Sequence, residues 1–426
     1  MYSDQKQALT ISTISFTICF AVWTIFSIIG VQIKQDLCLN STQFGLLAGM
    51  PILVGSLSRV ALGIWTDQYG GRLIFTIIML AGSISTYLLS YATSYETFLL
   101  AAAGVGIAGG SFAVGIAYVS RWFELKQQGT ALGIFGMGNV GAAVTKFFAP
   151  FVMVSFGWQM VAKTWAASLF IMACIFYIFC KDDPVLLSHQ AKGTKPTSFK
   201  AALLPLKKLQ VWRFSLYYFF VFGGFVSLAL WLPIYYIGVY NLDIKSAGML
   251  GAMYSIPGSL FRSYGGVLSD RYGARKVMYW TFIVCIICTF LLSYPSTDYI
   301  VHGIKKDIHF NLSMGMYQFM AISFVLGFFM SLGKAAVYKH IPVYYPNHIG
   351  SVGGITGLVG GLGGFILPII FGALNDLTSI WTSCFMFLFL IVSIAFIWMH
   401  VSIVMMEKRK YPDLHKHTYF PELDNQ

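Results

Sequence analysis

Twelve long apolar runs, separated by short polar segments, follow one another along this sequence. Each run has about the 20 apolar residues that an α-helix needs to cross the hydrocarbon core of a bilayer. Only 10% of the residues are charged, whereas a soluble domain carries roughly 25%. This composition excludes a soluble enzyme, and we expect an all-α polytopic membrane protein. The predicted spans are 9–33, 42–65, 73–93, 97–120, 129–155, 158–180, 212–238, 246–268, 276–294, 312–338, 349–374 and 379–405.

The lysines and arginines outside these spans predict the orientation of the chain. Placing the N-terminus in the cytoplasm puts nineteen of them in cytoplasmic segments and four in external ones. Because cytoplasmic loops carry the excess of positive charge, both termini are expected on the cytoplasmic side of a plasma (inner) membrane. The formal net charge of +12 then reflects topology, and no nucleic-acid partner is needed to explain it.

A long polar gap divides the twelve spans into two groups of six. It covers residues 181–211 and holds six lysines, so we expect a solvated cytoplasmic linker. The predicted division is an N-terminal half at 1–180, the linker at 181–211, a C-terminal half at 212–405 and a cytoplasmic tail at 406–426.

Two sequence patterns recur between the halves. The pattern R-x3-G-x3-D-x-Y-G-x-R begins at Arg59 and again at Arg262, 203 residues later. The pattern G-x3-G-I-x-G begins at Gly129 and again at Gly350, 221 residues later. Two six-helix repeats of the same orientation are typical of transporters that bind their substrate near the bilayer midplane, between the halves.

Five basic residues fall within the predicted spans, where each charge costs about 2.5–3.5 kcal/mol on insertion scales. Arg59 and Arg262 each precede a cytoplasmic aspartate by eight residues, which places them about 12 Å inward. Equivalent positions in the two repeats should make them face each other. A planar oxyanion between them would satisfy both guanidinium forks. The alternative is that each arginine snorkels or caps backbone carbonyls.

The other three intramembrane charges are lysines. Lys146 and Lys163 lie nearer the external ends of their spans, and we expect both to snorkel to the outer interface. Lys334 lies near the midplane, where burial and two neighbouring arginines favour loss of its proton. It is therefore the candidate for proton coupling, and a helix-packing role is the alternative.

Glycines crowd the fifth and eleventh spans, where small residues allow close helix contact. They also leave backbone open to a ligand and let helices slide. Asn139 is a polar side chain among them, and we expect it to face the site. Phe112, Tyr218 and Phe222 lie near the same depth, but aromatic residues in so apolar a chain are usually packing residues. The glycines concerned include Gly133, Gly136, Gly138, Gly141, Gly354, Gly357, Gly360 and Gly361.

Taken together, these residues resemble the nitrate/nitrite porter family of the major facilitator superfamily. The resemblance rests on Phe20–Trp23, Gly109–Ala113 and the glycine signatures at 133–141 and 353–364. It implies that Arg59 and Arg262 clamp nitrate, that Asn139 and Tyr218 donate hydrogen bonds, and that Phe112 covers one face of the anion. Ser263 departs from the pattern, which has proline after the second arginine.

The polar loops after the second and eighth spans resemble the short acidic-basic loop motif of the same superfamily. That resemblance implies a cytoplasmic gating latch in which an aspartate pairs with an arginine and a helix end. The alternative is that these charges only determine topology. The residues concerned are Asp67, Arg72, Asp270, Arg271 and Arg275.

The predicted function is secondary active transport of nitrate and nitrite by alternating access, with nitrate uptake by proton symport preferred. Nitrate/nitrite antiport, a porter for another small anion such as a carboxylate, and a non-transporting anion sensor remain alternatives. Enzyme activity is not expected, because the eight histidines lie in loops or at span ends. We expect a monomer in the bilayer, with no metal and no cofactor.

Overall fold

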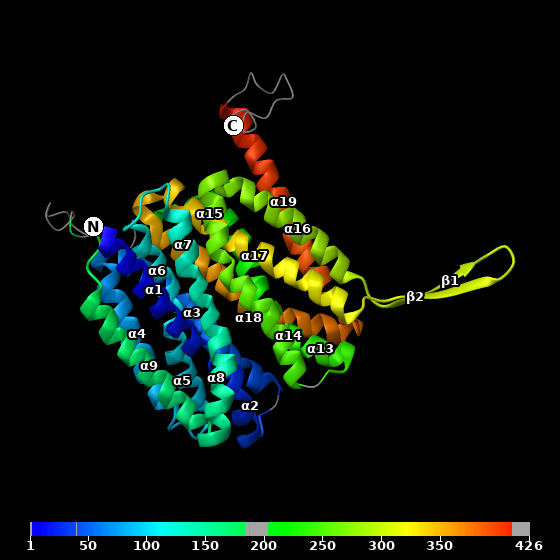
Figure 1. The fold of residues 1–426 in the computed structure, drawn as a ribbon, viewed down its shortest axis with the longest axis horizontal. Helices are drawn as coiled ribbons and strands as arrows, with labels where there is room; N and C mark the ends of the chain where they lie inside the picture. The colour runs from blue at the N-terminus through cyan, green and yellow to red at the C-terminus, as the bar shows by residue number, and fades with distance from the viewer. Residues whose placement is uncertain (1, 40, 185–186, 188–202, 243, 411–426) are drawn as a thin grey trace.

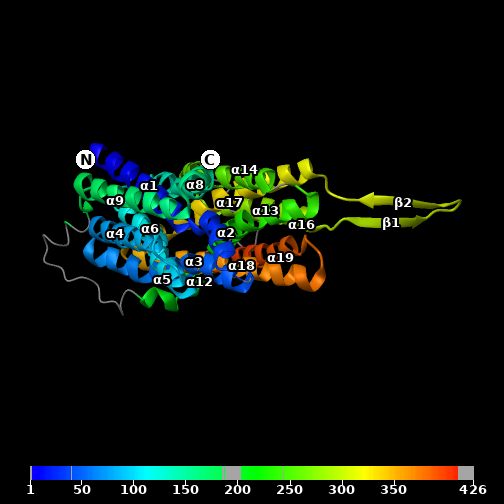
Figure 2. The same cartoon turned by 90° about the horizontal axis from the view of Figure 1, so that it is seen from below.

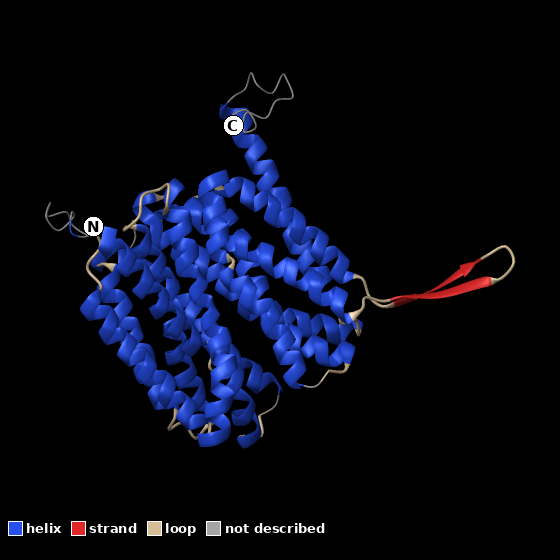
Figure 3. Ribbon diagram, viewed as in Figure 1, coloured by secondary structure: helices blue, strands red, loops and turns tan. Residues whose placement is uncertain are grey.

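The computed structural model describes the chain except for residues 1, 40, 185–186, 188–202, 243 and 411–426. It is a helical bundle, as predicted (Figure 3). The elements of the N-terminal half are α1 (Tyr2–Trp23), α2 (Phe26–Asp36), α3 (Ser41–Tyr69), α4 (Gly71–Leu89), α5 (Tyr95–Gly106), η1 (Ile107–Gly110), α6 (Ser111–Ser120), α7 (Gln128–Gly136), η2 (Met137–Val140), α8 (Gly141–Phe156) and α9 (Trp158–Phe179).

The C-terminal half repeats this arrangement and adds two strands. Its elements are η3 (Leu204–Lys207), α12 (Leu209–Tyr218), η4 (Phe219–Gly224), α13 (Phe225–Tyr240), α14 (Ile244–Leu260), α15 (Arg262–Tyr272), α16 (Ala274–Ser293), β1 (Thr297–His302), β2 (Asp307–Leu312), α17 (Met316–Tyr344), η5 (Pro346–His348), α18 (Ile349–Thr378) and α19 (Ser383–Lys410).

Several membrane passes consist of more than one element. Within the described residues, eleven helical stretches are long and apolar enough to cross a bilayer. The one predicted span missing from these eleven is the eighth, because a break at Phe261 divides it into the two shorter helices α14 and α15. The first pass is likewise divided, after Trp23. Twelve passes place both ends of the chain at the same end of the bundle, as Figure 1 shows.

The segment between the ninth and tenth spans, for which the sequence indicated no secondary structure, forms a hairpin. Residues 297–302 and 307–312 pair as an antiparallel hairpin, which projects from the external ends of α16 and α17 (Figures 1 and 2). Alternating residues such as Tyr299, Val301 and Ile308 have the β-branched and aromatic character that favours strands. The C-terminal helix continues to Lys410, beyond the predicted end at 405. Most of the predicted linker and tail lies outside the described residues.

The turn after the second span and the turn after the eighth have the same backbone conformation. Gly70 and Gly273 adopt φ angles of 89° and 86° and precede α4 and α16 directly. A residue with a side chain rarely adopts this conformation. The glycine in each copy of the repeated motif is therefore required by the turn from one helix into the next.

The halves meet along two helix pairs that the repeat relates. α3 packs on α18, and α15 packs on α7. A Cβ at Gly63 would lie 2.2 Å from the Gly350 carbonyl oxygen, and one at Gly266 would lie 2.1 Å from that of Gly129. Backbone therefore touches backbone at both crossings, near the cytoplasmic ends of the helices, where a larger residue could not fit.

Candidate anion-binding site

The two arginines of the repeated motif lie close together at the interface between the halves. Arg59 is on α3 and Arg262 begins α15, and their exposed fractions are 1% and 0%. Their guanidinium carbons lie 5.6 Å and 4.8 Å from the centroid of the Phe112 ring. Within the described part of the chain neither arginine is in an ion pair. Two buried cations therefore share one aromatic ring without a neutralising carboxylate.

Arg59 is held by backbone carbonyls from both halves. Its Nε donates to the Gly109 carbonyl at 3.2 Å, and its Nη1 donates to the Gly357 carbonyl at 2.5 Å. The guanidinium also lies over the rings of Trp23 and Phe222, at 5.6 Å and 5.4 Å. These contacts stabilise a buried cation and fix its plane. The capping of carbonyls that we gave as the alternative role is therefore present for Arg59.

Arg262 differs, because two of its donors have no partner. Its Nη2 is 3.5 Å from the Tyr218 hydroxyl, but Nε and Nη1 are buried without a hydrogen bond. Both polar atoms of the Asn139 side chain are also buried and unpartnered. A buried polar group left in this state costs about 1–3 kcal/mol. The donors of Arg262 and Asn139 suit a ligand that offers several oxygen acceptors.

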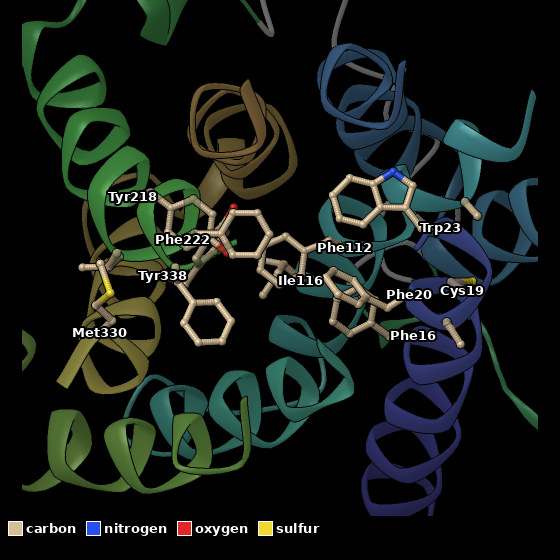
Figure 4. Packing of buried hydrophobic residues seen from close by; sticks show 14 of the residues in the cluster. Phe16, Cys19, Phe20, Trp23, Phe112, Ile116, Tyr218, Phe222, Met330 and Tyr338 are labelled. Atoms are coloured by element: carbon tan, nitrogen blue, oxygen red, sulfur yellow. The ribbon is translucent and has the colours of Figure 1, made fainter. Parts of the chain in front are cut away.

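Flat aromatic side chains gather at the site, where Phe112, Tyr218, Phe222 and Tyr338 lie close together (Figure 4). The rings of Tyr218 and Phe222 stack with centroids 5.0 Å apart and planes within 4°. Phe112 lies parallel to both within 8°, at 6.1 Å and 6.3 Å. Tyr338 meets Phe112 edge-on, at 4.9 Å and 86°. Parallel apolar faces with donors at their edges suit a small planar anion.

Irregular helix turns carry three of the residues at this site. The tightened turn η1 supplies Gly109, and η2 supplies Asn139. The π-helical turn η4 lies between Tyr218 and α13 and contains Phe222. Such turns release backbone groups and often occur at functional sites. Their alignment at one depth produces a polar centre in an otherwise apolar bundle.

The signature glycines make room for the arginines across the interface. A Cβ at Gly136 would lie 2.2 Å from Nε of Arg262, and one at Gly357 would lie 3.1 Å from Cδ of Arg59. The two contacts are related by the repeat, so each half provides the space for the arginine of the other. A Cβ at Gly360 would lie 2.3 Å from the Tyr218 ring.

The remaining signature glycines bring helices together. Added Cβ atoms at Gly133 and Gly354 would lie 2.7 Å and 2.6 Å from the carbonyl oxygens of the two arginines. Gly138 and Gly141 face the first helix, α1. Gly361 faces Ser56 and the Arg59 guanidinium. The glycines therefore allow close approach, and three of the eight, Gly136, Gly357 and Gly361, border a guanidinium directly.

The predicted latch aspartates each receive hydrogen bonds from a helix of the opposite half. Asp67 accepts from the Gly350 and Ser351 amides at the start of α18, at 3.3 Å and 3.2 Å. Asp270 accepts from the Gly129 and Thr130 amides at the start of α7, at 3.0 Å and 2.6 Å. Free amides and the helix dipole favour an anion at such a helix start. The two contacts hold the halves together at the end of the bundle that carries both termini.

The basic partners of these aspartates lie outside the predicted loop motif. Arg121 pairs with Asp67 at 2.6 Å, and Lys339 pairs with Asp270 at 2.5 Å. Each directly follows a predicted span, the fourth or the tenth, and this position was the signal available from the sequence. The Lys339 ammonium also donates to the Leu125 carbonyl.

The arginines that we grouped with the latch make other contacts. Arg72 donates to the Tyr177 carbonyl at 2.8 Å and lies 3.6 Å from Asp182. Arg275 pairs with Glu407 at 3.5 Å. Arg271 is exposed, with its guanidinium over the Tyr272 ring. An arginine one to five residues after the aspartate points away, because the chain turns into the next helix there.

Lys334 is fully buried on α17, away from the aromatic centre. Its Nζ donates to the Gly258 carbonyl at 2.7 Å and lies 3.3 Å from the centroid of the Phe225 ring. Gly258 is in the last turn of α14, where helix carbonyls lack helical partners. The lysine therefore contacts the helix break that comes directly before Arg262.

Two further aromatic residues of the site were not singled out from the sequence. Tyr338 donates to the Gly353 carbonyl at 3.0 Å and borders Phe112, Tyr218 and Arg262. Its place one turn after Lys334, on the same face of the helix, was the available signal. Trp23 donates to the Pro51 carbonyl at 2.6 Å and covers Arg59.

Comparison with known proteins finds relatives that are named as membrane transporters. The family model described as Major Facilitator Superfamily matches residues 11–316. The chain is 42% identical to the probable nitrate/nitrite antiporter NarK1 of Thermus thermophilus, over 94% of this chain and 92% of that protein. It is 29% identical to the probable nitrate transporter NarT of Staphylococcus haemolyticus, over 92% and 95% of the two chains.

Two more similarities extend this set. The nitrite extrusion protein of Bacillus subtilis is 27% identical, over 94% of this chain and 96% of that protein. Among solved structures, the human organic anion transporter MFSD10 (TETRAN) superposes with a TM-score of 0.69 at 13% identity, covering 93% and 99% of the two chains. At that identity the superposition supports the fold alone.

Proposed function

The chain belongs to the nitrate/nitrite porter family of the major facilitator superfamily, and we propose that it carries nitrate and nitrite across the membrane by alternating access. The observation that carries this proposal is the pair of buried arginines around Phe112, with unpartnered donors on Arg262 and Asn139. A trigonal oxyanion offers acceptors in one plane, and the flat rings accept that plane. The relatives named for nitrate or nitrite support the same substrates.

Within this proposal the residues have distinct roles. Arg59 and Arg262 bind the anion oxygens, Tyr218 and Asn139 add hydrogen bonds, and Phe112 covers one face. Asp67 and Asp270 hold the cytoplasmic ends of the halves closed until the substrate-loaded bundle rearranges. We place the protein as a monomer in the inner membrane with both termini in the cytoplasm.

Counterflow in proteoliposomes tests the substrate assignment. Internal nitrate or nitrite should each drive uptake of labelled nitrate, and a formate arm tests whether the site also accepts a carboxylate. Efficient formate counterflow with no nitrate counterflow would identify a carboxylate porter. Binding of nitrate with no counterflow of any anion would identify a sensor.

The substitution Arg59→Lys tests the clamp. Lysine keeps the positive charge but loses the planar fork, so nitrate affinity should fall by more than tenfold in a binding assay. Lys163→Gln is the matched control, because it alters an intramembrane basic residue over the Tyr91 ring. Near-normal nitrate affinity in Arg59→Lys would refute bidentate binding.

We propose proton symport as the coupling mode, with Lys334 as the proton-linked group. The Lys334 ammonium donates to the Gly258 carbonyl beside the break before Arg262, so losing its proton would weaken this charge-assisted contact next to the arginine. Antiport is the second candidate, and the name of the Thermus relative favours it. Exchange requires no titrating group.

Lys334→Gln separates the two modes. Under symport it should abolish nitrate uptake driven by a pH gradient, while nitrate/nitrite exchange continues. The wild-type protein provides the reference for both assays. Gradient-driven uptake at the wild-type rate in Lys334→Gln would rule out this role of Lys334.

A further inference from the structure

Lys146 is an intramembrane cation without a partner. It lies on α8, in the external half of the fifth pass, and within the described part of the chain it forms no hydrogen bond or ion pair. Charged side chains in such positions usually pair or face a water-filled space. From the sequence we expected Lys146 to snorkel to the outer interface. The residues on the other faces of α8 argue against that expectation.

The lipid-facing side of α8 is occupied by other residues. Phe147, Phe148 and Phe151 are exposed by 66%, 55% and 67%. At 100° per residue, these rings centre about 150° around the helix from Lys146. The side chain therefore points away from the surface where a snorkelling lysine would need to be.

A second face of α8 is also occupied. Thr145 donates to the Ala21 carbonyl and accepts from the Trp165 indole, so this face packs on α1 and α9. Lys146 shares the remaining face with Pro150 and Met153, which are half-buried. α14 of the opposite half contacts α8. α2 of the same half also contacts α8, and by elimination of the other faces we infer that Lys146 faces the junction of the two halves.

This face of the fifth pass leads to the anion site. Asn139 stands seven residues before Lys146, which is about two helical turns, or roughly 10 Å along the helix. Two turns return nearly to the same direction, so Lys146 lies above Asn139 on the external side. The cytoplasmic side is closed by the contacts of Asp67 and Asp270.

We propose that Lys146 attracts small anions from the external solution into the junction of the halves and passes them to the arginine pair. The inference rests on the proposed transport function. An unpaired positive charge at the entrance raises the local anion concentration and the association rate. It leaves the arginine pair unchanged, so it acts on KM rather than on the maximal rate.

A reporter cysteine tests the local potential without any transport. Met153→Cys lies two turns farther out on the same face and is introduced with Cys38→Ser and Cys174→Ser, which remove the exposed cysteines. The ratio of labelling rates for a sulfonate and a trimethylammonium methanethiosulfonate should fall roughly threefold to tenfold when Lys146→Gln is added. Lys163→Gln should leave the ratio unchanged. An unchanged ratio in Lys146→Gln overturns the proposal.

Nitrate uptake from the external side supplies the second readout. Lys146→Gln should raise KM roughly threefold to tenfold at nearly normal maximal rate, Lys146→Arg should restore KM, and Lys163→Gln should match wild type. Equal KM values for both glutamine variants would overturn the role of Lys146. Absence of nitrate uptake in wild type would instead refute the proposed function, while the labelling ratio would still report on Lys146.

Discussion

Each central arginine packs against a glycine of the other half, and the two contacts differ in tightness. A Cβ at Gly136 would overlap Nε of Arg262 at 2.2 Å, whereas one at Gly357 would meet the Tyr338 hydroxyl at 3.0 Å and Cδ of Arg59 at 3.1 Å. A contact near 3 Å can be relieved by a small side-chain shift. One at 2.2 Å requires the guanidinium to leave its position.

Alanine substitutions should therefore have unequal effects at these matched positions. We expect Gly136→Ala to lower nitrate affinity by more than tenfold, and Gly357→Ala to lower it only severalfold. Isothermal titration of purified protein provides the measurement. Gly372→Ala is the control, because a Cβ there meets no atom within 4 Å. Equal effects at 136 and 357 would show that the arginine positions adapt freely.

At the scale of elements, the starts of α7 and α18 are joined to the opposite half by one aspartate each. Asp270 and Lys339 are 11% and 10% exposed, and Asp270 also accepts hydrogen bonds from the Gly129 and Thr130 amides of the opposite half. Removing one partner of a buried, hydrogen-bonded charge pair costs roughly 2–5 kcal/mol. The exposed pair of Arg72 and Asp182 is worth at most about 1 kcal/mol.

Asp270→Asn should accordingly lower the melting temperature of the detergent-solubilised protein, and Asp182→Asn should barely change it. Asparagine keeps the size of the side chain but leaves Lys339 without its counter-charge. Comparing the two variants separates the effect of losing the Asp270 contacts from the effect of losing any carboxylate. Similar melting temperatures for the two variants would argue against a stabilising latch.

At the scale of the whole molecule, the arrangement of twelve passes determines which surfaces share a compartment. Ile304 at the hairpin tip is fully exposed, and Arg271 is exposed in the last turn of α15. With both termini in the cytoplasm, these two positions lie on opposite sides of the membrane. The excess of lysine and arginine on one side is the physical basis for the orientation.

Cysteine labelling of intact cells tests this topology. In a Cys38→Ser, Cys174→Ser background, Ile304→Cys should react with a membrane-impermeant maleimide in intact cells. Arg271→Cys should react only after permeabilisation, and it serves as the internal control. The reverse pattern would mean that the chain is inserted with its termini outside.

Much of the architecture follows from local properties of the chain. The apolar runs, the basic loops and the repeated motifs predict the helical membrane fold, which the structure and the family both confirm. Arg59, Arg262 and Phe112 could be placed at one depth because residue counts along a helix convert directly into distance. The hairpin at 297–312 was missed because its short strands lie between long apolar runs that dominate the pattern.

Contacts between helices could not be obtained in this way. Such contacts depend on how the helices rotate about their axes and cross. Examples are the pairing of Asp67 with Arg121 and of Asp270 with Lys339, the edge-on contact of Tyr338 with Phe112, and the direction of the Lys146 side chain. Hydropathy and spacing within one helix carry no information on that rotation, since it is determined by the close packing of residues far apart in the chain. The helices and their depth are thus properties of the sequence, and the partners of each charge are properties of the folded bundle.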